Sequence, residues 1–92
     1  MKLKPMDVVV QPSRGVAGRK VIGVITSIWQ SYATVYAKVC WVGEVHNNGE
    51  LTEWPYFPTC SELLDTLAKA PEAYTDAVLE ALTIDKFTKS QC

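Results

Sequence analysis

The sequence predicts an α+β fold in which a small, strongly bent antiparallel β-barrel is followed by two short C-terminal helices. Three observations predict it: β-branched runs broken by turn residues, an Asn-Gly pair between two of these runs, and a change to helical spacing after Pro58. A chain of 92 residues holds one domain with a single modest core. We therefore expect one domain over residues 1–92, with the barrel at 7–58 and a two-helix extension at 59–88.

The first two predicted strands lie on either side of a glycine-containing loop. Residues 7–11 are a short β-branched run that ends at Pro12. Residues 21–29 are too rich in β-branched side chains for a comfortable helix, and Gly23 in their interior predicts a bulge or bend. A sharp bend of this kind suits a small barrel.

A turn at residues 30–33 leads into a third predicted strand at 34–42. Its alternation favours burial of one face, made of Val35, Ala37, Val39 and Trp41. The Asn48-Gly49 pair then predicts a hairpin into residues 51–54, because both residues tolerate positive φ. The aromatic and proline-rich segment 53–58 would close the barrel.

Helical spacing begins at residue 59. Thr59 and Glu62 have the spacing of a capping box, and leucines then recur at helical intervals to about Lys69. Pro71 suits the first turn of a second helix, whose apolar stripe comprises Tyr74, Ala77, Val78, Ala81 and Leu82. We expect both stripes to pack on the barrel or on each other.

Four short strands, a glycine in the second strand, a hairpin and a closing aromatic-proline strand resemble Src-homology-3-like small barrels. Within that group, Gly18, Gly23-Val24-Ile25 and Ile28, preceded by basic residues, are similar to the KOW motif of transcription and ribosomal proteins. The resemblance covers about residues 7–58. It implies a barrel fold and, through the KOW motif, nucleic-acid binding, although small barrels host many unrelated activities.

Charge is distributed unevenly along the chain. Residues 1–40 contain six cations and one acid, a net charge of +5, whereas residues 41–92 contain three cations and nine acids, a net charge of −6. A dipolar molecule of this kind can steer a charged partner to one end. The alternative is that strands and helices simply carry different surface residues.

The residue types favour binding over catalysis. The one histidine, His46, is predicted on a hairpin loop without an orienting acid or buried nucleophile beside it, so we expect no enzyme activity. Cys40, Cys60 and Cys92 match neither a zinc site nor a redox pair, and we expect three free thiols in a reducing compartment and no metal or cofactor. The chain shows no secretory signal and no stretch of 18 apolar residues, which predicts a cytoplasmic protein that does not enter membranes, as a monomer or homodimer.

Two binding hypotheses remain. The first is a non-catalytic protein-binding module, an adapter or an inhibitor of a larger complex, comparable in size and composition to small phage accessory proteins. Its candidate contact residues are Glu53, Trp54, Tyr56 and Phe57, because Trp and Tyr are favoured interface anchors. The strand alternation implies that not all three aromatic side chains face inward.

The second hypothesis is a KOW-like nucleic-acid-binding domain. Its candidate phosphate contacts are Arg14, Arg19, Lys20 and Lys38, and its candidate stacking surfaces for bases are Trp29, Tyr32 and Tyr36. The net acidity of the second half of the chain counts against it. For each of these aromatic residues, packing within the barrel is the simpler interpretation.

Overall fold

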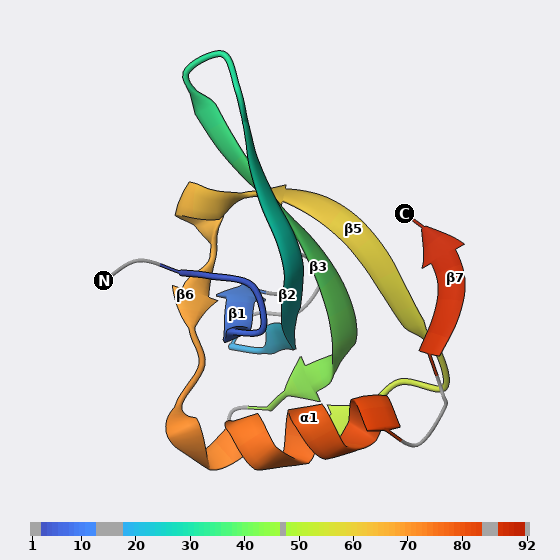
Figure 1. Cartoon of the computed structure of the whole chain (residues 1–92). Helices are drawn as coiled ribbons and strands as arrows, with labels where there is room; N and C mark the ends of the chain where they lie inside the picture. Colours follow the sequence, from blue (N-terminus) through green and yellow to red (C-terminus); the bar gives the residue numbers. More distant parts are fainter. Residues whose placement is uncertain (1–2, 13–17, 47, 84–86, 92) are drawn as a thin grey trace.

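The computed structural model describes residues 3–12, 18–46, 48–83 and 87–91, and it shows a sheet-dominated α+β domain with one short α-helix (Figure 1). The elements follow one another as β1 (Val8–Pro12), β2 (Lys20–Ser31), β3 (Thr34–Val45), β4 (Leu51–Glu53), β5 (Phe57–Leu63), the 3-10 turn η1 (Leu64–Thr66), β6 (Ala68–Lys69), the 3-10 turn η2 (Glu72–Tyr74), α1 (Thr75–Thr83) and β7 (Phe87–Gln91).

The described strands form one sheet in the order β6-β1-β2-β3-β5-β7, and β4 also pairs with β3. All neighbours are antiparallel except β5 and β7, which run parallel. The two end strands, β6 and β7, do not pair with each other. The sheet is therefore curved but open, and it is compatible with a barrel-like domain without being the closed barrel that the sequence predicts.

The bend predicted at Gly23 is confirmed. The register between β2 and β3 shifts between Ile22 and Gly23, as at a β-bulge. A Cβ atom at Gly23 would lie 2.4 Å from the carbonyl oxygen of Cys40 and 2.9 Å from the Cα of Trp41. Only glycine fits this close approach of the two backbones.

The predicted Asn48-Gly49 hairpin is also confirmed, since β3 and β4 pair on either side of it. Gly49 has a φ of 86°, and its N–H donates to the carbonyl oxygen of His46 at 2.9 Å. The side chain of Asn48 accepts a hydrogen bond from the backbone N–H of Glu50 at 2.9 Å. The turn chemistry expected from the sequence fixes the loop.

The first predicted helix is wrong. Residues expected to begin it form β5 instead, which pairs with β3 from Thr59 opposite Cys40 to Leu63 opposite Tyr36. Pairing with β3 satisfies backbone groups along an otherwise open edge, and this tertiary gain overrides the local helical spacing. The second predicted helix is confirmed in shortened form, as η2 followed by α1.

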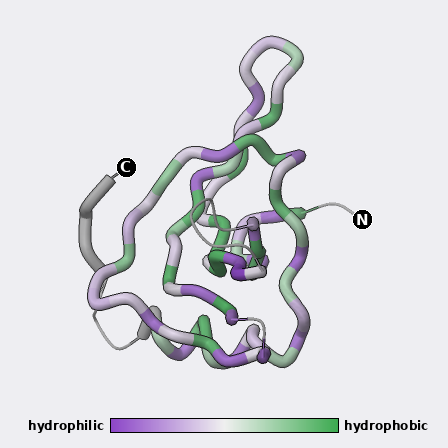
Figure 2. Tube along the Cα trace, turned by 180° about the vertical axis from the view of Figure 1, so that it is seen from behind, coloured by the Kyte–Doolittle hydropathy of each residue, from purple (hydrophilic) through white to green (hydrophobic). Residues whose placement is uncertain are grey.

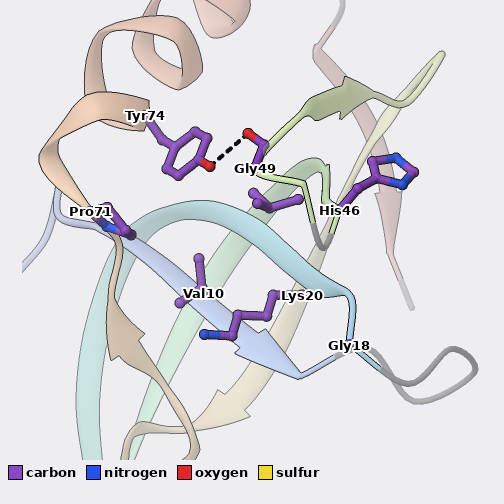
Figure 3. A pocket seen from close by; sticks show the side chains of 8 residues that line it. Val10, Gly18, Lys20, His46, Gly49, Pro71 and Tyr74 are labelled. Carbon is purple, nitrogen blue, oxygen red and sulfur yellow. Dashed lines mark hydrogen bonds between the residues drawn. The ribbon is translucent and has the colours of Figure 1, made fainter.

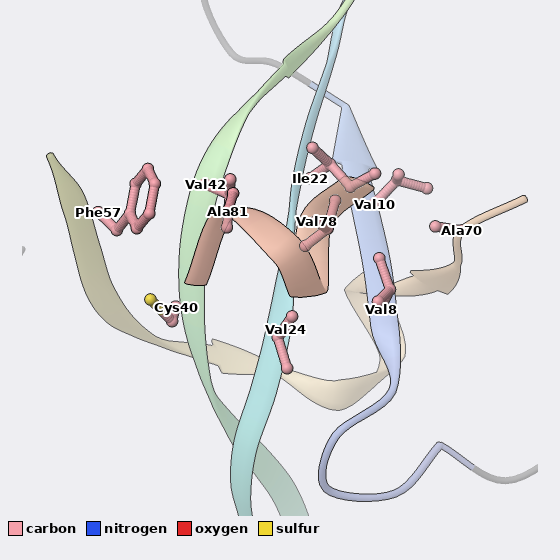
Figure 4. Packing of buried hydrophobic residues seen from close by; sticks show 10 residues of the cluster. All are labelled: Val8, Val10, Ile22, Val24, Cys40, Val42, Phe57, Ala70, Val78 and Ala81. Carbon is pink, nitrogen blue, oxygen red and sulfur yellow. The ribbon is translucent and has the colours of Figure 1, made fainter. Parts of the chain in front are cut away.

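The sheet is buried on both faces. On one face, α1 covers a core cluster in which Val78 and Ala81 meet strand residues (Figure 4). That cluster comprises Val8, Val10, Ile22, Val24, Cys40, Val42, Phe57, Ala70, Val78 and Ala81. The second cluster lies on the opposite face and comprises Val9, Ile25, Ala37, Val39, Trp41 and Leu67.

This double burial refines the predicted core face of β3. Ala37, Val39 and Trp41 are buried as expected, whereas Val35 is half-buried because it lies beyond the end of β5. Cys40, which the alternation places on the other face, is completely buried, because α1 covers part of that face.

The prediction of three free cysteines is wrong for Cys60, which is disulfide-bonded. Cys40 is a free, buried thiol, and Cys92 lies outside the described residues. Burial raises the pKa of the Cys40 thiol above its ordinary value. In the part of the chain that the structure describes, no helix has the length and apolar character needed to cross a membrane.

Candidate protein-binding surface

The candidate surface is the segment Trp54–Pro58, which connects β4 to β5. The backbone N–H of Trp54 donates to the carbonyl oxygen of Val42 at 2.9 Å, which holds the start of the segment against β3. The Trp54 side chain is half-buried and packs on the second core cluster. One face of its indole is therefore fixed by the core.

A shallow pocket of about 320 Å³ opens on this segment, and its described lining consists of Trp54, Pro55, Tyr56 and Pro58. Tyr56 is 52% exposed. Two aromatic rings and two proline rings on one short segment make a mainly apolar hollow whose backbone has little freedom to move. We call this feature the Trp54–Pro58 pocket.

Phe57 does not belong to this surface, although it is one of the predicted contact residues. Its side chain is completely buried and packs in the cluster beneath α1 (Figure 4). Phe57 begins β5, and the alternation along the segment turns Phe57 inward and Tyr56 outward. Glu53 is exposed at the end of β4, opposite Gly43, and directly precedes the segment in the sequence.

The residues of the nucleic-acid hypothesis are only partly brought together. Arg19 and Lys20 lie at the start of β2, and the guanidinium of Arg19 is 3.6 Å from the carboxylate of Glu44. Trp29 and Tyr32 lie at the other end of the same strand and in the turn after it. A strand rises about 3.3 Å per residue, so Lys20 and Trp29 lie up to roughly 30 Å apart along the bulged strand β2.

The remaining members of that set lie in different places. Lys38 is exposed on β3 two residues from Tyr36, so it lies on the same face as the Trp29–Tyr36 pair. Arg14 lies outside the described residues. Among the described cations of this set, Lys38 is therefore beside the aromatic groups, whereas Arg19 and Lys20 are not.

The aromatic end is the β2–β3 hairpin, which projects beyond the rest of the molecule in both views (Figures 1 and 2). Trp29 and Tyr36 are cross-strand partners whose rings stack with centroids 5.7 Å apart and planes 18° apart. Tyr32, in the turn, is 99% exposed and has a φ of 54°.

Leu63 extends this aromatic row onto β5, where it pairs with Tyr36 and is 45% exposed. Sequence reasoning missed Leu63 as a surface residue because it placed the side chain in the apolar stripe of a helix. The paired positions of Trp29, Tyr36 and Leu63 carry their side chains on one face of three neighbouring strands.

A second cavity, also of about 320 Å³, lies between η2 and the β3–β4 hairpin (Figure 3). The hydroxyl of Tyr74 donates to the carbonyl oxygen of Gly49 at 2.7 Å across it, and Lys20 lies along its wall. The imidazole of His46 points away from this cavity, and its Nε2 lies 2.8 Å from the hydroxyl of Thr52.

The described residues include no group of three or more His, Cys, Asp or Glu side chains placed to hold a metal ion. The exposed aromatic side chains of the described residues lie at the Trp54–Pro58 pocket and on the projecting hairpin.

Comparison with known proteins finds no matching family model, no matching curated protein and no matching solved structure.

Proposed function

We propose that this protein is a non-catalytic protein-binding module, an adapter or an inhibitor of a larger complex, which binds its target through the Trp54–Pro58 pocket. The observation that carries the proposal is the exposed Tyr56 beside the anchored Trp54 in an apolar hollow. The partner that fits is a protein segment that inserts an aliphatic or aromatic side chain into this hollow, next to Glu53 in the sequence.

The energetics support this assignment. Aromatic anchors that are already ordered lose little conformational entropy on binding, and Trp and Tyr in well-packed pockets supply most of the energy of many interfaces. Trp54 is held by its backbone hydrogen bond and by the core, and prolines flank Tyr56 on either side of the pocket. The surface is therefore organised before any partner arrives.

The separation of Arg19 and Lys20 from the exposed aromatic residues supports a protein target over a nucleic acid, because it leaves Lys38 as the one described cation of the nucleic-acid hypothesis beside them. A polyanion would gain most at Arg19 and Lys20, but Arg19 is already paired with Glu44. The described lining of the Trp54–Pro58 pocket includes no arginine or lysine. The exposed hydrogen bond between the side chains of His46 and Thr52 connects the two sides of the β3–β4 hairpin and stabilises it, and neither residue lines the Trp54–Pro58 pocket.

The test is an affinity capture of the tagged protein from its native lysate, performed with and without nuclease, for the wild type and two variants. Tyr56→Ala removes the exposed ring of the pocket, and Ser61→Ala is the control because Ser61 is exposed on the same strand, β5, but lies outside the pocket lining and the aromatic row. We expect a stoichiometric protein partner that survives nuclease and Ser61→Ala.

Tyr56→Ala should weaken the association by roughly 30-fold, the effect of losing a hot-spot residue of about 2 kcal/mol. Capture of nucleic acid, with protein partners lost after digestion, would contradict the proposal. So would a protein partner whose binding is the same for Tyr56→Ala and the wild type.

A further inference from the structure

The projecting part of the β2–β3 hairpin, residues 26–37, contains no charged side chain and no proline. We call this segment the arm. Its outer strand is an open edge. β1 pairs with β2 as far as Val24, Ile25 exchanges hydrogen bonds with Asp7 and Met6, and no described strand pairs with β2 from Thr26 to Ser31 on that side.

An unprotected edge of this kind is unusual. Proteins commonly protect exposed strand edges with charges, prolines or covering segments, because unpaired N–H and C=O groups are a template for another strand. The arm of this protein has neither of the first two, and both views show it projecting clear of the rest of the molecule (Figures 1 and 2).

The direction of the unpaired backbone groups follows from the register. The N–H of Ile25 donates to Asp7 and its C=O accepts from Met6, so both groups point away from β3. Thr26 is the extra residue of a bulge, after which Ser27, Ile28, Trp29 and Gln30 pair in turn with Lys38, Ala37, Tyr36 and Val35. Because bonded and non-bonded pairs alternate in an antiparallel ladder, Ile28 and Gln30 present their N–H and C=O groups to the open edge.

We propose that two copies of this chain pair along this edge, β2 against β2, antiparallel and related by a two-fold axis at Trp29. In that register Ile28 of each copy lies opposite Gln30 of the other, so the outward backbone groups of all four residues form hydrogen bonds. Side chains at Ile28 and Gln30 share one face of the strand, as an antiparallel pair requires. The edge is thus complementary to itself.

Trp29 then faces its own equivalent across the axis. Each Trp29 already stacks on Tyr36, and Tyr36 pairs with Leu63. The two rows join into one apolar row across six strands, in which the 39%-exposed Trp29 becomes buried at the centre. Aromatic pairs opposite each other on neighbouring strands each add about 0.2–1 kcal/mol to sheet pairing.

Two exposed residues lie at the ends of the segment that would pair. Met6 and Tyr32 are the described non-glycine residues with positive φ, at 77° and 54°, and they are 65% and 99% exposed. The two-residue turn between Ser31 and Thr34 accounts for the conformation of Tyr32. Neither side chain is buried within one copy.

In the proposed pair, Tyr32 of one copy lies opposite Thr26 of the other, next to the Ile25 backbone that bonds Met6. Tyr32 and Met6 of different copies therefore meet at each end of the paired strands. A second copy is favoured over an unrelated segment because its own edge supplies an uncharged strand of matching length, with Trp29 meeting Trp29 at its centre.

The test is sedimentation equilibrium over a wide range of protein concentration, for the wild type, Trp29→Lys and Thr34→Lys. Trp29→Lys places two like charges directly across the axis, whereas Thr34→Lys adds the same charge on the inner strand of the hairpin. We expect the wild type and Thr34→Lys to approach twice the monomer mass with rising concentration, and Trp29→Lys to remain monomeric while circular dichroism shows it folded.

Amide hydrogen exchange of the wild type supplies a readout that needs no variant. The amides of Ile28 and Gln30 should gain at least tenfold protection between dilute and concentrated protein, while the amide of Trp29, already directed at β3, changes less. A wild type that stays monomeric at millimolar concentration would overturn the proposal. So would a dimer that is unchanged by Trp29→Lys or that leaves the two edge amides unprotected.

Discussion

Phe57 and Tyr56 are adjacent in the sequence, but the first is in the core and the second is on the surface. We expect Phe57→Ala to lower the stability of the domain and Tyr56→Ala to weaken only the binding of the partner. Phe57 is completely buried beneath α1, whereas Tyr56 is 52% exposed. Truncating a buried phenylalanine costs about 3–5 kcal/mol, from lost transfer energy and the cavity left behind. Truncating an exposed side chain usually changes stability by no more than about 0.5 kcal/mol.

These magnitudes are large on the scale of the whole domain. A chain of 92 residues is stabilised by about 5–14 kcal/mol, so Phe57→Ala removes at least about a fifth of the total. At about 4–8 °C per kcal/mol, the melting temperature falls by about 12–40 °C. Tyr56→Ala should leave the melting temperature within a few degrees of the wild type and weaken only the association with the partner.

Urea unfolding followed by circular dichroism measures both effects, with an unchanged m-value as the check that the unfolding reaction is the same. A loss below about 1 kcal/mol for Phe57→Ala would refute the assignment of this side chain to the core. Destabilisation of Tyr56→Ala as large as that of Phe57→Ala would refute its assignment to the surface.

Three other predictions concern the bulge, the buried thiol and the basic end of the sheet. Gly23→Ala should destabilise the domain by about 1–3 kcal/mol in urea titrations, because the new methyl group meets backbone atoms that cannot rotate away; an unaltered midpoint would contradict this. Burial raises the pKa of the Cys40 thiol, and a hydrogen bond with Thr59 opposes the shift only in part. The neutral, buried Cys40 thiol therefore contributes fully to stability below pH 9.0, the ordinary pKa of a thiol, and this contribution is lost as the pH rises toward the raised pKa. The free energy of unfolding should accordingly fall less steeply at alkaline pH in Cys40→Val than in the wild type. Reversing the charges of Arg19 and Lys20 together should leave partner affinity within about twofold in pull-downs at several salt concentrations, and loss of a salt-sensitive association would instead favour the nucleic-acid hypothesis.

The parts of the fold that sequence reasoning predicted correctly are those governed by local chemistry. Asn48 and Gly49 define their hairpin through turn geometry alone, and Gly23 marks its bulge because a side chain has no room there. The stripe of Val78 and Ala81 is amphipathic enough to identify a helix that packs on the sheet.

The predictions that were wrong concern segments whose secondary structure depends on pairing with a strand distant in the sequence. The local rules for a helix are satisfied by Thr59, Glu62 and the following leucines. However, the seven residues of β5 form backbone hydrogen bonds with β3, and a short isolated helix would be less stable than this pairing. The position of Leu63 beside Tyr36 depends on that pairing. The spacing of residues within one segment does not show which other strand pairs with that segment. Neither the open sheet nor the apolar row of Trp29, Tyr36 and Leu63 could therefore be predicted from the sequence.

The candidate site also combines features that local sequence patterns predict with features that depend on strand pairing. Alternation correctly implies that one of Trp54, Tyr56 and Phe57 stays at the surface, but which one depends on the residue at which β5 begins. The interleaving of basic and aromatic residues in the sequence suggests one surface for nucleic acid. Two long antiparallel strands instead carry Lys20 and Trp29 to opposite ends.

If the Trp54–Pro58 pocket binds the target and the arm joins two copies, the dimer should bind a multivalent target more tightly than a single copy does. A pair of copies joined through Trp29 presents two Trp54–Pro58 pockets, so a target with repeated sites is bound with an avidity up to about 10²- to 10⁴-fold above that of one pocket. Trp29→Lys should lose this gain on a densely immobilised target and keep the wild-type affinity on a sparse one, whereas Tyr56→Ala should bind weakly at both densities. If Trp29→Lys weakened binding equally at both densities, the arm would contact the target directly, and its open edge would serve the partner rather than a second copy.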